Sequence, residues 1–447
     1  MTYSDSFRKS APARRPGWTL LAVSLGGAMV GLDGTALTIA GPEIGRSTGA
    51  SLSGLQWITT AYLLALALAL FPAGRLADRF GRRAVFLAGV AGFGVVSVLI
   101  ALTSTAATLI ALRALQGVCG AMLQPAALAL LRMAFPPHRL ELALGVWGGA
   151  SAASIAAGPI VAGLLVRWAG WQAVFLVNAP IAVLTTLLTL ATVAESRADA
   201  GRARAADLLR APGVAVGAAL TVLSYFSLFG LLFFLTLYLQ NVRGLGPVDA
   251  GLWLLPVTVV VVLSAPLGGA LTARFGPRRP AIWGFVLVAV GMLGFTLLDV
   301  DTGWTDALPA SLVLGLGTGV ALIASTQVIV AGAPLALTGL ASALQQVATQ
   351  LGGVAGIVVL GAVMSWRAKA VLPDEAVTQG LVPPGADPGK AHLAFLSGFA
   401  ATAAVASVVV IAGAVVAVRI RSGRAVPEPA GPPDLASDVD GEGGDQQ

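Results

Sequence analysis

Long apolar runs alternate with short polar segments along most of the chain. Twelve runs reach the length of about 20 residues that an α-helix needs to cross the hydrocarbon core of a bilayer. They cover residues 17–44, 54–74, 84–103, 106–131, 142–166, 171–193, 213–240, 248–271, 280–299, 308–332, 339–366 and 391–418. Strands are not expected, because lipid offers an unpaired backbone group no hydrogen-bond partner. The pattern predicts an all-α membrane protein with twelve transmembrane helices.

The composition of the 447-residue chain supports this interpretation. Hydrophobic residues make up 57% of the chain and charged residues 11%, whereas an ordinary soluble domain has roughly 25% charged residues. So few charges exclude a soluble enzyme, a secreted disulfide scaffold and a fibrous protein. The single cysteine, Cys119, lies in an apolar run, where a buried thiol is expected. His138 and His392 are far apart in the sequence, so no metal site is predicted.

The basic residues indicate how the helices are oriented. Twenty of the 27 Lys and Arg lie before the first run or after an even-numbered run, six lie in the other loops, and Arg113 lies inside a run. Because basic residues accumulate in cytoplasmic loops, both termini are predicted to be cytoplasmic in a multi-pass protein of the cell membrane. The net charge of +6 follows from this topology, so nucleic acid is not an expected partner. The length of the first run and its internal Asp33 favour a retained helix over a signal peptide.

The polar segment 195–212 divides the predicted helices into six and six. It is the longest predicted cytoplasmic break and holds four arginines and three acidic residues. The predicted organisation is an N-terminus at 1–16, a six-helix bundle at 17–194, a linker at 195–212, a second bundle at 213–424 and a tail at 425–447. The acidic tail is rich in Pro and Gly and is expected to be disordered.

Two similar segments reveal an internal repeat. Residues 74–83 read Gly-Arg-Leu-Ala-Asp-Arg-Phe-Gly-Arg-Arg, and residues 269–278 read Gly-Ala-Leu-Thr-Ala-Arg-Phe-Gly-Pro-Arg. Each copy follows the second helix of its half, so the halves are predicted to be parallel repeats. The glycines permit a tight loop, and the arginines hold that loop at the inner membrane surface. Ala273 replaces Asp78 in the second copy, so the halves are not equivalent there.

The first copy of the repeat resembles the loop motif of the major facilitator superfamily, which lies between the second and third helices. Residues 31–42, Gly-Leu-Asp-Gly-Thr-Ala-Leu-Thr-Ile-Ala-Gly-Pro, look like the first-helix signature of the drug–proton antiporters in that family. Residues 56–64 look like the opening of their second helix, and residues 113–117, Arg-Ala-Leu-Gln-Gly, match their fourth-helix motif. The glycine-rich motif of the fifth helix is matched by Gly145, Ser154, Gly158, Pro159, Ala162 and Gly163. The resemblance covers residues from about 17 to 420.

The resemblance implies the major facilitator fold and proton-coupled export of a hydrophobic or amphipathic small molecule, such as a drug or a secondary metabolite. It implies no cofactor, and the expected partners are the cargo, protons and the lipid bilayer, with the protein a monomer. The signatures are most similar to the group that usually has fourteen helices. Here residues 207–210 lead directly into the seventh helix, so two central helices are expected to be absent.

Other functions stay open at this stage. The same fold can import a metabolite with protons, and a membrane sensor that transports nothing is a further alternative. No Gly-rich nucleotide-binding loop with a Lys-Ser/Thr end occurs in the sequence, so ATP is not expected to drive transport. No nucleophile–base pair suggests an enzyme. An ion gradient or the gradient of the cargo itself is left as the energy source.

Asp33 and Arg113 are the strongest candidates for coupling protons to transport. An ionisable group inside a transmembrane helix costs several kcal/mol and suggests a function. Asp33 lies roughly 24 Å along the first helix from its inner end, and Arg113 lies roughly 9 Å from the outer end of the fourth. In a core about 30 Å thick both lie in the outer half, where they can form a pair. The alternatives are a carboxylate that only packs helices together and an arginine that only binds backbone carbonyls.

The loop motif is predicted to be a conformational latch rather than a proton carrier. Its residues are Gly74, Asp78, Arg79, Gly81, Arg82 and Arg83. Asp78 can accept hydrogen bonds from a neighbouring helix terminus at the inner surface. On the fifth helix, Gly145, Ser154, Gly158, Pro159 and Gly163 permit close helix contact and a bend. That contact is either a seam against proton leak or an ordinary packing face. Glu43 ends the first helix and is expected to be solvated.

Aromatic and amide side chains are the candidates for the cargo cavity. A cavity of this kind suits a bulky, weakly polar molecule. The aromatic side chains can instead face lipid or the protein core, whereas glutamines in a membrane need polar partners. The predicted cavity residues are Tyr62, Gln116, Tyr225, Phe229, Phe233, Gln327, Gln345 and Gln346.

Overall fold

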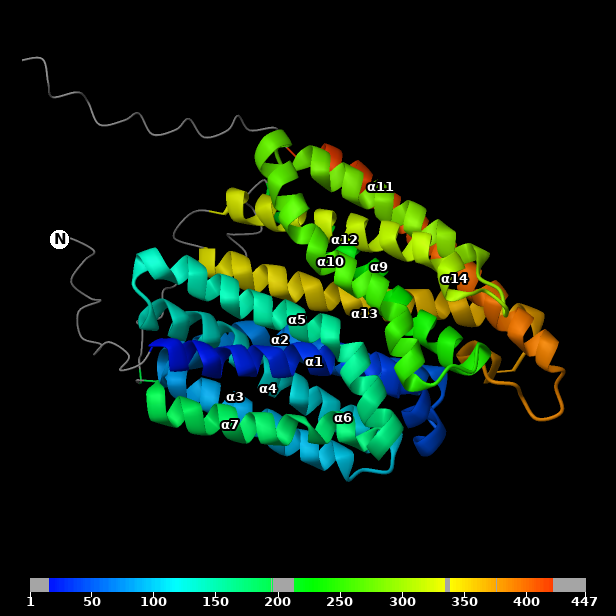
Figure 1. Cartoon of the computed structure of the whole chain (residues 1–447), viewed down its shortest axis with the longest axis horizontal. Coiled ribbons are helices and arrows are strands. Elements are labelled where there is room, and N and C mark those ends of the chain that lie inside the picture. Colours follow the sequence, from blue (N-terminus) through cyan, green and yellow to red (C-terminus); the bar gives the residue numbers. More distant parts are fainter. Residues whose placement is uncertain (1–15, 194, 196–212, 334–337, 375, 421–447) are drawn as a thin grey trace, which may run out of the picture.

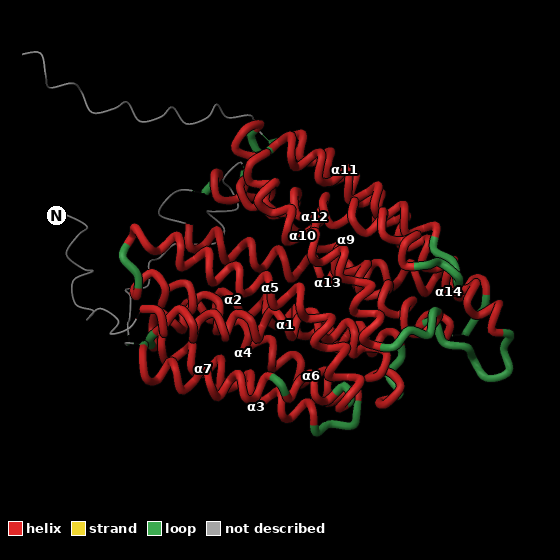
Figure 2. The backbone as a smooth tube through the Cα atoms, viewed as in Figure 1, coloured by secondary structure: helices red, strands yellow, loops and turns green. Residues whose placement is uncertain are grey.

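The computed structural model describes residues 16–193, 195, 213–333, 338–374 and 376–420. The predicted N-terminal segment up to residue 15, the linker from 196 to 212 and the tail at 425–447 lie outside the described residues. Figure 2 shows helices and loops, and no strand occurs in the described ranges. The prediction of an all-α protein is therefore confirmed.

Residues 16–193 form seven helical segments that make six spans. They are α1 (Pro16–Thr48), α2 (Leu52–Phe80), α3 (Arg82–Ala101), α4 (Ala106–Ala134), α5 (Pro137–Ala169), α6 (Gln172–Leu176) and α7 (Asn178–Thr192). α6 and α7 together form the sixth span. The break between them has a cause in the sequence, because Pro180 has no N–H to donate to the carbonyl of Leu176.

The second half repeats the arrangement. It contains α9 (Val214–Leu237), the π-helical turn η1 (Tyr238–Val242), α10 (Pro247–Phe275), α11 (Arg278–Gly294), η2 (Phe295–Leu297), α12 (Trp304–Gly332), α13 (Thr338–Val371), η4 (Ala376–Gln379) and α14 (Pro388–Val418). Across the described ranges eleven helices are long and apolar enough to cross a membrane, and the bent α5 makes twelve. The predicted number of spans is confirmed.

The helices extend beyond the apolar runs that predicted them. The eleventh run was expected at 339–366, whereas α13 continues to Val371 and carries Arg367 and Lys369 in its last turns. Charged side chains are unfavourable in the hydrocarbon core, but they do not prevent the backbone from being helical. A helix can therefore continue beyond the membrane into water. Side chains cap several starts: the Ser51 hydroxyl accepts from the Gly54 amide at 3.3 Å, and Thr105 does the same for Thr108 at 3.3 Å.

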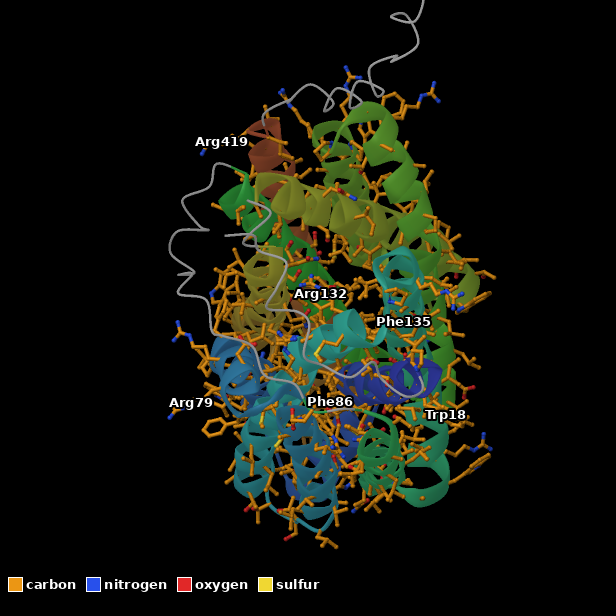
Figure 3. The ribbon with its side chains drawn as sticks, turned by 90° about the vertical axis from the view of Figure 1, so that its left-hand side faces the viewer. Trp18, Arg79, Phe86, Arg132, Phe135 and Arg419 are labelled. Atoms are coloured by element: carbon orange, nitrogen blue, oxygen red, sulfur yellow. The ribbon has the colours of Figure 1, made fainter. Side chains whose placement is uncertain are left out.

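Most of the helices run roughly along the long axis of the molecule, and α10 crosses it obliquely (Figure 1). The start of α1 and the end of α14 lie at the same end, together with Arg79, Arg132 and Arg419 (Figure 3). We call this the basic end. It matches the end at which the sequence analysis placed most of the basic side chains.

The two halves make close contacts at the end opposite to the basic end. Gln56 at the start of α2 donates to the carbonyl of Ile357 on α13 at 3.0 Å, and Gln240 in η1 donates to the carbonyl of Ile39 on α1 at 2.8 Å. α5 packs against α10 so closely that a Cβ at Gly163 would lie 2.7 Å from the carbonyl oxygen of Pro247. These contacts hold the halves together far from the start of α1 and the end of α14.

Candidate functional site

A buried ion pair joins α1 to α4. Arg113 Nη1 lies 2.6 Å from Asp33 Oδ2, and each side chain is 1% exposed. The depth estimate from the sequence placed both groups at one level, and the structure brings them into direct contact. An unpaired charge at this position would be strongly unfavourable, so each group makes burial of the other acceptable.

Close packing of α2 against α4 positions the arginine. A Cβ at Gly117 would overlap the backbone of Tyr62, so only glycine permits this approach. Arg113 Nε then donates to the carbonyl of Ile58 at 3.3 Å. The guanidinium lies 4.2 Å from the Tyr62 ring centroid and 5.7 Å from that of Phe175, and both contacts favour the cation.

Three uncharged polar side chains complete the site. Gln116 Oε1 accepts from Arg113 Nη1 at 2.6 Å, while Gln116 Nε2 donates to Asp33 Oδ1 at 3.3 Å and to Ser97 Oγ at 2.8 Å. Asn178 Nδ2 donates to Asp33 Oδ1 and to Ser97 Oγ, both at 3.3 Å. Gln116, Asn178 and Ser97 are fully buried. Five helices (α1, α2, α3, α4 and α7) therefore contribute to one polar network inside an apolar bundle.

Sequence reasoning missed Asn178 and Ser97. Asn178 was visible as an amide inside the sixth apolar run, but no residue near it in sequence indicated a partner. Tyr62 and Gln116 were expected to line a cargo cavity, and here they are 2% and 0% exposed and contact Arg113. Their proposed contact with cargo would require a different conformation.

The loop motif at the basic end is held mainly by Glu195. Its carboxylate accepts from the backbone amides of Arg83 at 3.1 Å and Ala84 at 3.2 Å, at the start of α3. An anion there is favoured by the helix dipole and by the free N–H groups. Gly81 has φ 111°, and a Cβ at this position would overlap the carboxylate. Sequence reasoning treated Glu195 only as a linker acid.

Asp78 makes a more modest contact. Its Oδ1 lies 3.7 Å from Arg82 Nη2 one turn later, and the Asp78 side chain is 37% exposed. Arg83 Nη2 donates to the carbonyl of Leu190 at 2.9 Å, which ties the loop to the end of α7. Arg79 stacks on the neighbouring Phe80 ring at 5.3 Å. Gly74 lies beside Pro125 of α4.

The fifth-helix motif contacts both halves of the protein. A Cβ at Gly31 would meet the Ser154 hydroxyl, and one at Gly158 would meet that of Thr35, so this face of α5 packs on α1. A Cβ at Gly251 on α10 would lie 2.6 Å from the carbonyl of Pro159. α5 bends by 44° between its segments Leu142–Ile155 and Ala157–Ala169. Gly145 faces open space.

The candidate cavity residues of the second half are spread over three helices. The rings of Tyr225 and Phe229 on α9 lie 5.8 Å apart, and Tyr225 shares a hydrogen bond with Thr349 of α13. Gln345 donates to the Thr326 hydroxyl at 2.6 Å. The other three differ in burial, with Phe233 buried, Gln346 half-buried and Gln327 exposed.

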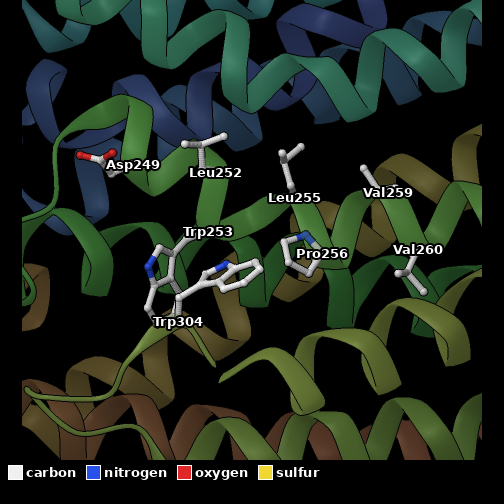
Figure 4. A pocket seen from close by; sticks show the side chains of 8 residues that line it. All are labelled: Asp249, Leu252, Trp253, Leu255, Pro256, Val259, Val260 and Trp304. Atoms are coloured by element: carbon white, nitrogen blue, oxygen red, sulfur yellow. The ribbon is translucent and has the colours of Figure 1, made fainter. Parts of the chain in front are cut away.

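A cavity of about 640 Å³ lies elsewhere, on the outer face of α10 (Figure 4). Trp253 and Trp304 close one side of it, and Asp249 lies at its end. None of the predicted cavity residues lines it. No group of three His, Cys, Asp or Glu side chains that could hold a metal occurs among the described residues.

Comparison with known proteins gives a consistent result. The sequence model described as Major Facilitator Superfamily matches residues 23–357. The chain is 37% identical to the tetracenomycin C resistance and export protein of Streptomyces glaucescens, over 91% of this chain and 92% of that protein. It is 32% identical to the multidrug efflux pump LfrA of Mycolicibacterium smegmatis, over 89% and 95%. A puromycin resistance protein of Streptomyces alboniger is also 32% identical, over 84% and 87%.

Solved structures with a similar fold include a bacterial homologue of the human lysosomal transporter Spinster in its inward-facing state. The unoccupied form matches with a TM-score of 0.76 at 18% identity, over 92% of this chain and 99% of that one. The occupied form matches with a TM-score of 0.77 at 19% identity. At this identity the likeness concerns the fold alone.

Proposed function

This chain belongs to the Major Facilitator Superfamily, and on that basis we propose that it is a proton-coupled secondary transporter that exports a hydrophobic or amphipathic small molecule. Relatives named for tetracenomycin export, multidrug efflux and puromycin resistance support export and this class of cargo. A drug or a secondary metabolite is the proposed cargo. The chain is thus a membrane transporter rather than an enzyme.

The buried pair of Asp33 and Arg113 is the observation that carries the proposal of proton coupling. A carboxylate 1% exposed and 2.6 Å from a guanidinium is stable only while the pair is intact. Any movement of α1 away from α4 leaves the carboxylate without its counter-charge, and proton uptake then neutralises it. When the pair forms again, the proton leaves. Helix movement and proton transfer are coupled in this way.

The contacts between the halves suggest how α1 moves. Gln240 binds the carbonyl of Ile39, which lies six residues after Asp33 on the same helix. Alternating access requires this contact and that of Gln56 with Ile357 to break when the end opposite the basic end opens. Opening of that end therefore releases a contact of α1, the helix that carries Asp33. We place both chain termini in the cytoplasm, because the arginine-rich basic end carries the start of α1 and the end of α14, and we propose a monomer.

The proposed cargo contacts lie between the halves. Tyr225 and Phe229 on α9 face α13, where a Cβ at Gly353 would touch both Phe229 and Leu63 of the first half. Rings on α9 together with amides on α13, such as Gln345 and Gln346, suit a flat and weakly polar molecule. The shared contact of α9, α13 and α2 means that cargo held there would touch both halves.

Flux in vesicles tests the function. Inverted membrane vesicles that contain the protein are energised with an inside-acid pH gradient, and a panel of fluorescent hydrophobic dyes is added outside. Accumulation of at least one dye that collapses with the gradient and is absent from vesicles with Asp33→Asn is expected. If dye accumulates only in right-side-out vesicles that are more acidic outside than inside, the protein is an importer and the proposal is contradicted.

A further inference from the structure

We propose that Asn178 is a positioning residue whose side-chain amide reverses when Asp33 gains or loses its proton. The inference rests on the proposed role of Asp33 in proton coupling. It concerns a residue of α7 at the break of the sixth span, where Val177 separates it from α6. Two amides, those of Gln116 and Asn178, touch the same oxygen of the Asp33 carboxylate.

Gln116 and Asn178 both donate to Asp33 Oδ1 at 3.3 Å, yet they differ in freedom to turn. Gln116 Oε1 accepts from Arg113 Nη1 at 2.6 Å, so reversal of this amide would place an NH₂ group against a guanidinium. Asn178 Oδ1 is buried and has no hydrogen-bond partner among the described residues. Reversal of Asn178 therefore breaks no bond to its oxygen.

A buried amide oxygen without a partner is costly, and it is uncommon in folded proteins. Here it is explained if the oxygen has a partner in the other protonation state. The ionised carboxylate accepts only, and Asn178 Nδ2 satisfies it. A protonated Asp33 Oδ1 carries an O–H that needs an acceptor. A half-turn of the Asn178 amide brings its oxygen to that position.

Ser97 can follow the same change. Its hydroxyl oxygen accepts from Gln116 Nε2 at 2.8 Å and from Asn178 Nδ2 at 3.3 Å. After reversal, the Ser97 O–H can rotate and donate to the same Asn178 oxygen, which has two lone pairs. The proton that enters from water stays on Asp33 Oδ1, and no bond other than hydrogen bonds is made or broken.

The surroundings leave few other groups to perform this role. Arg113 of α4 and Tyr62 of α2 are the ionisable side chains that face Asp33. α6 and α7 contain no ionisable residue, and the arginines of α3 lie at its first turn. Arg113 donates only and cannot accept from a protonated carboxyl. Of the two amides that contact Asp33 Oδ1, that of Asn178 is thus the one that can turn without losing a bond to its oxygen.

The sequence offers an unusually clean test, because the chain contains two asparagines, Asn178 and Asn241. Selective ¹³C labelling of asparagine side-chain carbonyls gives two signals in purified protein in lipid. The Asn241 amide, which donates to the carbonyl of Gln379 at 2.7 Å, is the internal reference. Asp33 titration is followed by the infrared C=O band of a protonated carboxylic acid, with Asp33→Leu as the blank.

The expected result is that the Asn178 carbonyl changes from a free to a hydrogen-bonded signal over the same pH range in which the Asp33 band appears, while Asn241 is unchanged. If the Asp33 band titrates and the Asn178 signal stays constant, the inference is overturned and the proposed function survives. If Asp33 shows no titrating band, the proton-coupling proposal itself is overturned, and the inference with it.

Asn178→Leu provides a second test that depends on sign. Loss of a donor alone would destabilise the ionised carboxylate and move the Asp33 titration to higher pH. Loss of the acceptor destabilises the protonated carboxyl and moves the Asp33 titration to lower pH. The ionised carboxylate loses less, because it still accepts from Arg113 and Gln116. We expect a downward shift of about one pH unit, which corresponds to about a tenfold change in proton affinity. No shift or an upward shift overturns the amide reversal, and Asn241→Leu is the matched control.

Discussion

Thr35 on α1 donates its hydroxyl hydrogen to the carbonyl oxygen of Ile155 on α5, 3.1 Å away. That carbonyl is free because Pro159, four residues later, has no N–H to offer it. Membrane helices tolerate proline where a neighbouring side chain satisfies the freed carbonyl in this way. Thr35 lies two residues after Asp33, so the bend of α5 is tied to the helix that carries the ion pair.

Thr35→Val removes this donor without changing the side-chain shape. We expect a loss of about 1 kcal/mol in stability, typical of a hydrogen bond between membrane helices, together with a looser contact between α1 and α5. Thermal unfolding in detergent measures it. Thr192→Val is the control, because Thr192 bonds only within its own helix, to Leu188 at 2.7 Å. If both substitutions lower the thermal stability equally, the hydrogen bond to Ile155 contributes no more than one within a single helix.

Glu195→Gln tests the anchor at the basic end. The substitution keeps the shape but removes the negative charge at the start of α3, where the helix dipole contributes about 0.3–1 kcal/mol. Hydrogen exchange at the amides of Arg83 and Ala84 is expected to become several-fold faster, because these amides donate to the carboxylate. Unchanged exchange at both positions would show that Glu195 does not hold the loop.

Asp78→Asn tests the proposed latch separately. Asp78 contacts Arg82 at 3.7 Å and is partly exposed, so little change in stability is expected. If Asp78 binds another helix terminus in the opposite conformation, turnover slows while the affinity for cargo stays nearly the same. Initial rates and dye binding in reconstituted vesicles separate the two quantities. A variant with normal flux would reduce the motif to a topological anchor.

The sequence predicted the fold closely, and the site in part. Apolar runs located all twelve spans, because every helix that crosses the bilayer needs about 20 apolar residues. The depth estimate placed Asp33 and Arg113 at one level because helix rise is constant. It could not identify Asn178 or Ser97, since their relation to Asp33 depends on how α3 and α7 pack around α1. Glu195 was missed for the same reason: only folding places the end of the sixth span beside the start of α3.

Arg113→Ala removes the counter-charge of Asp33. The unpaired carboxylate then holds its proton more tightly, so any residual transport is expected to be fastest at a higher pH than in the wild type. Arg113→Lys should retain more activity, because it keeps the charge, although it loses the planar set of donors that reaches Asp33, Gln116 and Ile58. Transport rates from pH 5.5 to about 9 compare the three proteins. A lower pH optimum in Arg113→Ala would contradict the pairing as the control of protonation.

The central claim is that Asp33 carries the coupling proton, and proton release from purified protein tests it most directly. A compound that the vesicle assay identifies as cargo is added to the protein in weakly buffered detergent solution with a pH indicator. Wild-type protein is expected to release protons on binding, whereas Asp33→Asn binds the compound without release, because its amide has the size of the carboxylic acid but no proton to give up. If Asp33→Asn releases protons as the wild type does, another group is the carrier and the account is wrong.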